Sequence, residues 1–311
     1  MALAVAAGHP STSGVYIPEI WSGKLVQKFY LSTVFGAIAN TDYEGEISAY
    51  GDKVNIRTIP NMIIDDYVPG ANLNYRTPEG AVVELLIDKA KSYSFKVNKV
   101  EQKQADIAYM DKWSDDAAMQ LKITIDANVL AGVYSSAHAD NKGATAGAIH
   151  GAVDLGAAGV PIEITKANVI DKIVECGQVL QEQNVPETGR WIVIPAWMAT
   201  RLKTSDLKDA SLTGDGTSTL RNGRIGRIDK FEVFESNNLS YANDGTYGGN
   251  CWHVLAGHNS GITFATQLVE NEMLPNPNDF GKLIRGLQVF GYKVIKPESL
   301  IDFYVAPAAL V

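Results

Sequence analysis

The stretch VEQKQADIAYMDKWSDDAAMQLKITIDANVLAGVY, residues 100–134, contains no proline and a single glycine, Gly132, near its end. Apolar side chains recur in it at every third or fourth position, the spacing of one helix face. These side chains are Ile107, Met110, Trp113, Ala117, Leu121 and Ile125. The pattern predicts one helix of roughly 50 Å, longer than most helices of globular domains, with Trp113 and Leu121 buried beneath it.

The residues before this helix have the pattern of a long hairpin. GEISAYGDKVNIRTI (45–59) and KSYSFKV (91–97) alternate apolar and polar side chains, which is typical of strands. IDDYVPGANLNYRTPEGA (64–81) is rich in Pro, Gly and Asn and predicts the tip of the hairpin. Because an isolated two-stranded ribbon is marginally stable in water, we expect a second subunit to cover it. This is the first indication of obligatory oligomerisation.

The remaining elements are shorter and alternate between helix and strand. We expect a short amphipathic helix within residues 17–38 of an N-terminal arm, a loop at 137–161, helices at 166–183 and from 196, strands at 191–195, 232–236 and 251–257, a helix at 261–274, and two final strands within 283–307 that turn at Lys296-Pro297-Glu298. No internal repeat occurs.

Composition restricts the possible partners. The chain has 35 acidic and 27 basic residues, a formal charge of -8 and a mean hydropathy of -0.05. An acidic chain is a poor candidate for gripping nucleic acid, since phosphate contacts require clustered Lys and Arg. Cys176 and Cys251 have no metal-ligand spacing and are expected to be buried and reduced. We expect no secretion signal and no membrane span, so the N-x-S sequon at Asn238 carries no function.

The stretch NGRIGRIDKFEVFESNNL, residues 222–239, has two glycines three apart but does not fit a phosphate-binding loop. Such a loop leads into a helix, whereas Gly223 and Gly226 precede a strand-like alternation. The glycines are therefore interpreted as turn residues. The nearby bases form a positive patch in an acidic protein, which we interpret as solvated loop charges or as an inter-subunit salt-bridge site; they are Arg221, Arg224, Arg227 and Lys230.

No catalytic, cofactor-binding or metal-binding residue is predicted. His253 and His258 are five apart, which does not place two ligands on one helix face, and GHNSG (257–261) does not match the G-x-S-x-G elbow. Asp111 and Asp115 are interpreted as a solvated helix face. Candidate contact residues instead lie at the hairpin tip, and they are Asp65, Asp66, Tyr67 and Arg76.

The order of these elements resembles that of the major capsid proteins of tailed bacteriophages. Three stretches carry the likeness, namely IPEIWSGKLV (17–26), NGRIGRIDKFEVFESNNL (222–239) and LQVFGYKVIKPESL (287–300). The resemblance implies an α+β protein with the Hong Kong 97-type fold. Its parts would be an N-terminal arm (1–42), an extended β-hairpin loop (43–98), a spine helix (99–135), a peripheral domain (136–163 with 275–311) and an axial domain (164–274).

The resemblance also implies self-assembly into the hexamers and pentamers of an icosahedral shell that encloses double-stranded DNA without sequence-specific binding. The shell would belong to the virion and would be assembled in the host cytoplasm. Further expected partners are a separate scaffolding protein, a portal and decoration proteins; no membrane is involved. Some relatives crosslink a loop lysine, but neither Lys89 nor Lys91 matches the motif, so no crosslink is predicted. Alternatives are an encapsulin-type nanocompartment shell and a soluble α+β enzyme.

Overall fold

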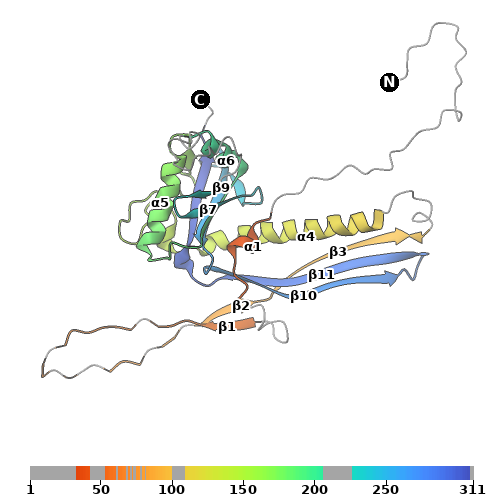
Figure 1. Ribbon diagram of the computed structural model, residues 1–311, viewed down its shortest axis with the longest axis horizontal. Coiled ribbons are helices and arrows are strands. Elements are labelled where there is room, and N and C mark those ends of the chain that lie inside the picture. Colours follow the sequence, from red (N-terminus) through yellow and green to blue (C-terminus); the bar gives the residue numbers. More distant parts are fainter. Residues whose placement is uncertain are drawn as a thin grey trace, which may run out of the picture.

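The computed structural model has three parts, which are a compact body, a long sheet backed by one helix, and an extended loop (Figure 1). The described residues are 33–42, 53–60, 62–67, 69–70, 72, 75–77, 79–80, 82–99, 109–205 and 226–308.

A seven-stranded mixed sheet forms the centre of the compact body. Its strands follow the order β4-β12-β9-β5-β7-β6, and β8 pairs with β9 beside this path. The bounds are β4 Ile162–Ile164, β5 Arg190–Ile194, β6 Arg227–Ile228, β7 Phe231–Glu235, β8 Tyr241–Asp244, β9 Gly249–His258 and β12 Leu300–Pro307, with helices α5 Val169–Glu182 and α6 Ala196–Lys203. Every residue of β5 is buried, because β7 and β9 pair with its two edges and neighbouring elements cover its faces. The helices, strands and loop predicted for 137–257 are confirmed.

The long sheet contains three antiparallel strands in the order β10-β11-β3. They are β3 Lys89–Asn98, β10 Ile262–Pro275 and β11 Gly281–Val294. Helix α4, Tyr109–Val133, runs along one face of this sheet (Figure 1). The ring of Phe95 meets Trp113 edge-on at 6.0 Å. The hydroxyl of Tyr292 donates to the backbone oxygen of Asn128 at 2.9 Å.

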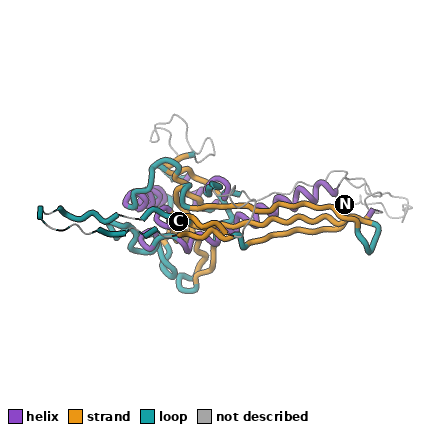
Figure 2. Tube along the Cα trace, turned by 90° about the horizontal axis from the view of Figure 1, so that it is seen from below, coloured by secondary structure: helices purple, strands orange, loops and turns teal. Residues whose placement is uncertain are grey.

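The extended loop begins at a short two-stranded ribbon. Strand β1, Lys53–Arg57, pairs antiparallel with β2, Val82–Leu86. The chain between them runs on as irregular backbone and points away from the body, in the direction opposite to the long sheet (Figures 1 and 2).

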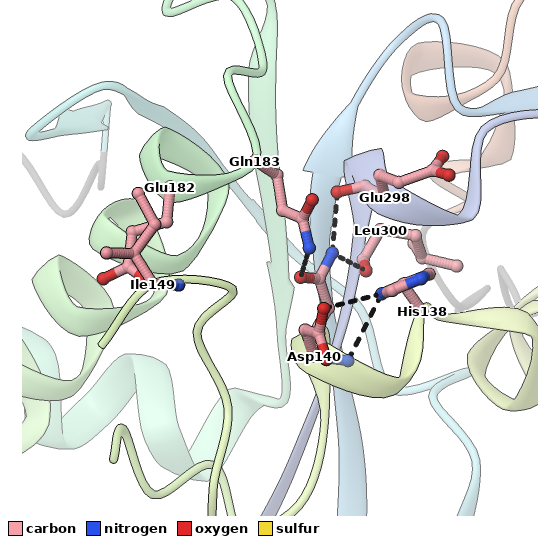
Figure 3. Close-up of polar contacts among 8 residues, drawn as sticks. His138, Asp140, Ile149, Glu182, Gln183, Glu298 and Leu300 are labelled. Atoms are coloured by element: carbon pink, nitrogen blue, oxygen red, sulfur yellow. Dashed lines mark hydrogen bonds and ion pairs between the residues drawn. The ribbon is translucent and has the colours of Figure 1, made fainter. Parts of the chain in front are cut away.

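Buried Asn141 anchors the loop that follows the long helix. Its side-chain nitrogen donates to the backbone oxygens of Glu298 and Leu300 at 2.6 and 3.0 Å, and its side-chain oxygen accepts from Gln183 at 3.3 Å (Figure 3). The remaining short helices are α1 Phe35–Ile38, η1 Tyr134–Ser136, η2 Ala139–Asn141 and η4 Pro297–Ser299. The last of these confirms the predicted turn between the final two strands.

The helix predicted at 261–274 is wrong. These residues form β10, which pairs with β11 from Ile262 to Pro275 with one irregularity between Thr266 and Leu268. The helix-forming residues of its second half, such as Glu270, favoured a helix locally, but the ladder with β11 satisfies the backbone as a strand. Tertiary pairing here outweighs local propensity.

The pairing expected in the hairpin also differs. The 91–97 stretch is a strand, as predicted, but it lies in β3 and pairs with β11 rather than with the 53–57 stretch. The partner of β1 is VVELL, residues 82–86. The ribbon is therefore short, and most of the loop beyond it is unpaired in the part of the chain that the structure describes.

The long helix is confirmed over 109–133, while 100–108 lies outside the described residues. Ile125 is buried, and Leu121 is half-buried against the main core. Trp113, predicted to be buried, is 46% exposed. Among the parts of the chain that the structure describes, the long sheet lies against the first half of α4, and the compact body does not cover it (Figure 1).

Sheet membership crosses the domain boundary expected at residue 275. Strand β10 (262–275) belongs to the long sheet, whereas β12 (300–307) lies inside the compact sheet between β4 and β9.

Of the helix expected within 17–38, the structure describes only the end, where α1 forms; 17–32 lies outside the described residues.

Candidate assembly interface

The extended loop presents large apolar side chains to solvent. Six side chains on the irregular part of the loop are between 67% and 95% exposed, and they are Ile59, Met62, Ile63, Ile64, Tyr67 and Tyr75. Among the described residues of the loop, the buried ones are all at its root, where Ile56, Leu85 and Ile87 pack together. A concentration of exposed apolar side chains marks a surface that another molecule covers. The loop is therefore the candidate interface.

The charged residues predicted at the tip come together within the chain. Arg76 donates to the carboxylate of Asp65 at 3.1 Å across the two arms of the loop. Both side chains are roughly half exposed, so the pair contributes only about 0–1 kcal/mol. Asp66 and Tyr67 lie beside it and are exposed. Sequence reasoning found these polar residues but missed Ile59, Met62 and Ile63; an apolar run inside a Pro- and Asn-rich segment was the available signal.

The predicted basic patch is only partly described, because Arg221 and Arg224 lie outside the described residues. Arg227 is exposed on β6, opposite Glu232 of β7. Lys230 forms an ion pair with Glu187 and lowers the pKa of that carboxyl by donating a hydrogen bond to it. Its described part, Arg227 and Lys230, lies on the compact body, and the structure does not bring these two residues to the extended loop within one chain.

Gly226 lies where the chain passes from loop into strand, as predicted, but the turn itself is at Asp229 and Lys230; Gly223 lies outside the described residues. Gly226 precedes β6, which forms a tight hairpin with β7. Asp229 occupies the turn with φ 50°. The segment that follows is a strand, and not the helix whose N-terminus would bind a phosphate.

The two histidines singled out in the sequence make structural contacts within the compact body. His253 Nδ1 lies 2.9 Å from a carboxylate oxygen of Asp302, and its ring stacks on Tyr134 with a centroid distance of 4.0 Å. His258 bonds through Nδ1 to Ser260 and through Nε2 to the backbone oxygen of Thr188. Each ring therefore connects neighbouring segments of the fold.

The other polar and reactive residues singled out in the sequence do not come together in one site among the described residues. Asp115 is exposed on α4, and the side chain of Asp111 lies outside the described residues. Cys176 and Cys251 are buried free thiols, and burial raises the pKa of Cys176 to about 12. Asn238, the sequon residue, is buried and donates to Asp126 at 2.7 Å. Among the described residues, no three His, Cys, Asp or Glu side chains are grouped as metal ligands.

Comparison with known proteins decides what kind of molecule carries this loop. The sequence matches the family described as phage capsid protein over residues 86–302, more than half of the chain. The chain belongs to the phage capsid protein family. It is a major capsid protein, and its place is the capsid of the virion. No curated protein sequence matches the chain.

Solved structures support the same assignment for this capsid protein. A structure of Mycobacterium phage Che8 matches with a TM-score of 0.78 and 28% identity, over 94% of this chain and 98% of that one. The capsid structure of the Cyanophage P-SCSP1u matches with a TM-score of 0.71 and 16% identity, over 94% of each chain. The mature capsid of bacteriophage PhiM1 matches with a TM-score of 0.67 and 12% identity, over 94% and 92%.

The capsid protein thus has the Hong Kong 97-type fold, as the order of its elements predicted. None of these findings favours a nanocompartment shell or an enzyme, and the family indicates a structural role. Within the described residues, no helix is long and apolar enough to cross a membrane.

Proposed function

We propose that this capsid protein assembles into hexamers and pentamers in which the extended loop of each subunit packs on the next. The supporting observation is the row of exposed apolar side chains from Ile59 to Tyr75. Water contact with this surface is unfavourable, by about 25 cal/mol for each Å² of apolar area. No element of the same chain covers the loop in the part that the structure describes. A neighbouring subunit can remove the surface from water.

The division into domains follows the sheets under this proposal. The peripheral domain contains α4 with β3, β10 and β11, and the axial domain contains the compact sheet, including β12. The arm is assigned to 1–42 and the extended loop to 43–88. Compared with the boundaries expected from sequence, β3 moves from the loop and β10 from the axial domain to the peripheral domain, while β12 moves from the peripheral to the axial domain.

The shell would enclose double-stranded DNA and be assembled in the host cytoplasm with a separate scaffolding protein, a portal and decoration proteins. The net charge of -8 supports a container that lies near DNA without gripping it. Contacts within the shell would include Asp65, Asp66, Tyr67 and Arg76 of the loop. Arg221, Arg224 and Arg227 of the basic patch remain candidates; Lys230 already has a partner in its own chain.

Removal of the loop tests the proposal. Residues Ile63 to Thr77 are deleted and the arms are joined by an Asn-Gly turn, which closes a two-residue hairpin. The expected product is a folded subunit that does not form closed shells, because β1, β2 and both cores remain. Circular dichroism and thermal melting report the fold, while sedimentation and electron microscopy report assembly. Normal shells, or an unfolded subunit, would contradict an inter-subunit role for the loop.

A further inference from the structure

The root of the extended loop crosses the long sheet where two opposite residues of that sheet have the smallest side chains. Ala265 of β10 and Gly291 of β11 are direct partners in the ladder. The adjacent pairs, Phe264 with Tyr292 and Thr266 with Phe290, place their side chains on the opposite face of the sheet, where Phe264 and Phe290 join the main core. On the face that the loop root covers, the Ala265–Gly291 pair presents only one methyl group. The ladder therefore has a local depression where two nearly absent side chains face each other.

The loop root occupies this depression. Ile56 of β1, Leu85 of β2 and Ile87 just after β2 are buried together with Ala265. They form a small apolar cluster that is separate from the main core of the compact body. We call Ala265 and Gly291 the seat of the loop.

Gly291 allows an unusually close approach. A Cβ atom at this position would lie 2.1 Å from the backbone oxygen of Leu86 and 2.9 Å from its carbonyl carbon. It would also lie 2.8 Å from Cδ1 of Ile87. The φ angle of Gly291 is outside the left-handed region, so backbone conformation does not demand glycine here. Glycine is required because a Cβ atom here would meet backbone atoms, which cannot rotate away as a side chain can.

The loop root cannot slide along the sheet to relieve such a contact. Only Ile87 and Asp88 separate the end of β2 from β3, and β3 pairs with β11 from Lys89 opposite Phe290 onward. The chain thus passes from a position above the sheet to a position within it over two residues. This register fixes Leu86 directly above Gly291.

We propose that the seat sets the direction in which the extended loop leaves the subunit, and that Gly291 is a positioning residue for shell assembly. This inference rests on the proposed role of the loop at the subunit contact. A loop whose irregular part is anchored only at its root can reach a neighbour reproducibly if that root is held at one angle. The seat provides this constraint through Ile56, Leu85 and Ile87.

The test adds one methyl group in the full-length chain. Gly291→Ala should displace β2, so amides of 53–57 and 82–87 should exchange hydrogen faster, and closed shells should be lost. Exchange in the buried strand β5 should stay unchanged. Gly245→Ala is the matched control, because no atom lies within 4 Å of a Cβ built there. Each variant is produced with any head proteins that the wild-type chain needs for shell formation.

A second variant loosens the seat without adding a clash. Ile87→Ala removes a side chain that packs on Ala265, and its control, Ile149→Ala, removes an exposed one from the compact body. Ile87→Ala should reproduce the faster exchange and the loss of shells. If Gly291→Ala or Ile87→Ala forms normal shells while the loop deletion still blocks assembly, the proposed role of the seat is wrong and the loop contact stands. Normal shells from the deletion would overturn the proposed loop contact, and the seat's role in assembly with it.

Discussion

Gly132 shows how a single residue joins the long helix to the sheet beneath it. Glycine inside a helix costs about 1 kcal/mol relative to alanine. A Cβ at this position would lie 2.0 Å from the hydroxyl oxygen of Tyr292, the group that donates to the backbone oxygen of Asn128. The glycine therefore makes room for the side chain that fastens β11 to α4.

Gly132→Ala should lower the free energy of unfolding by about 1–3 kcal/mol, as overpacking does, although helix propensity alone favours alanine. Gly36→Ala in α1 is the control, since a Cβ there meets no atom within 4 Å. Chemical denaturation of both variants measures the difference. Equal stabilisation by the two alanines would show that Tyr292 does not depend on Gly132.

Helical spacing in the sequence correctly predicted which residues share a face of α4, but not how deeply each is buried. Ile125 is buried where the compact body covers the helix. Trp113, on the same expected face, is half exposed where it packs on Phe95 of the long sheet, beyond the compact body. The helical period shows which way a side chain points, whereas the depth of its burial depends on the element packed against that part of the helix.

Between elements, Asp126 of α4 connects three parts of the molecule. Its carboxylate is fully buried and accepts from the backbone nitrogens of Val34 and Phe35 at 2.9 and 2.8 Å. It also accepts from the side chain of Asn238 at 2.7 Å. A helix as short as α1 is not stable by itself, so this carboxylate holds α1 against α4 and the compact body.

Asp126→Ala should lower the free energy of unfolding by about 3 kcal/mol, because two buried donors and one partly buried donor would lose their acceptor. Asp126→Asn should cost less, since its oxygen can still accept from both backbone nitrogens. Asp115→Ala on the exposed side of the same helix should change stability by no more than about 0.5 kcal/mol. Denaturant unfolding compares the three variants, and a small effect of Asp126→Ala would contradict the anchoring role.

Local sequence patterns predicted most helices and strands of the compact body, where amphipathic spacing and burial agree. They could not assign β10, because its second half favours a helix and only the ladder with β11 makes it a strand. Nor could they identify the partner of β1. Alternation shows that a segment is a strand but not what it pairs with: β3, the expected partner of β1, pairs with the distant strand β11, and β1 pairs with β2 instead.

For the whole molecule, the order of elements along the chain predicted the fold, because that order is what the family shares. The assembly contact could not be derived in the same way, since its second half belongs to another copy. The loop and the long sheet point in opposite directions (Figures 1 and 2). If the loop of one copy covers a different surface of the next, the contact is head-to-tail, and such contacts form a ring when the rotation between copies closes. This geometry suits the hexamers and pentamers that we propose.

A pair of matched substitutions separates the shell from the subunit. Ile64 on the loop and Ile149 on the compact body are 89% and 82% exposed, so aspartate at either position should leave the melting temperature of the subunit unchanged. In the shell the two should differ. Ile64→Asp would place an unpaired charge in an apolar contact, next to Asp65 and Asp66, at a cost of several kcal/mol for each contact.

Sedimentation and electron microscopy should therefore show few closed shells for Ile64→Asp and normal shells for Ile149→Asp. The comparison holds residue type, exposure and added charge nearly constant, so a difference in assembly reflects position alone. Shells from Ile64→Asp at the wild-type yield would mean that the apolar surface of the loop stays in water. Equal loss from both variants would mean that added charge, and not the loop, controls assembly.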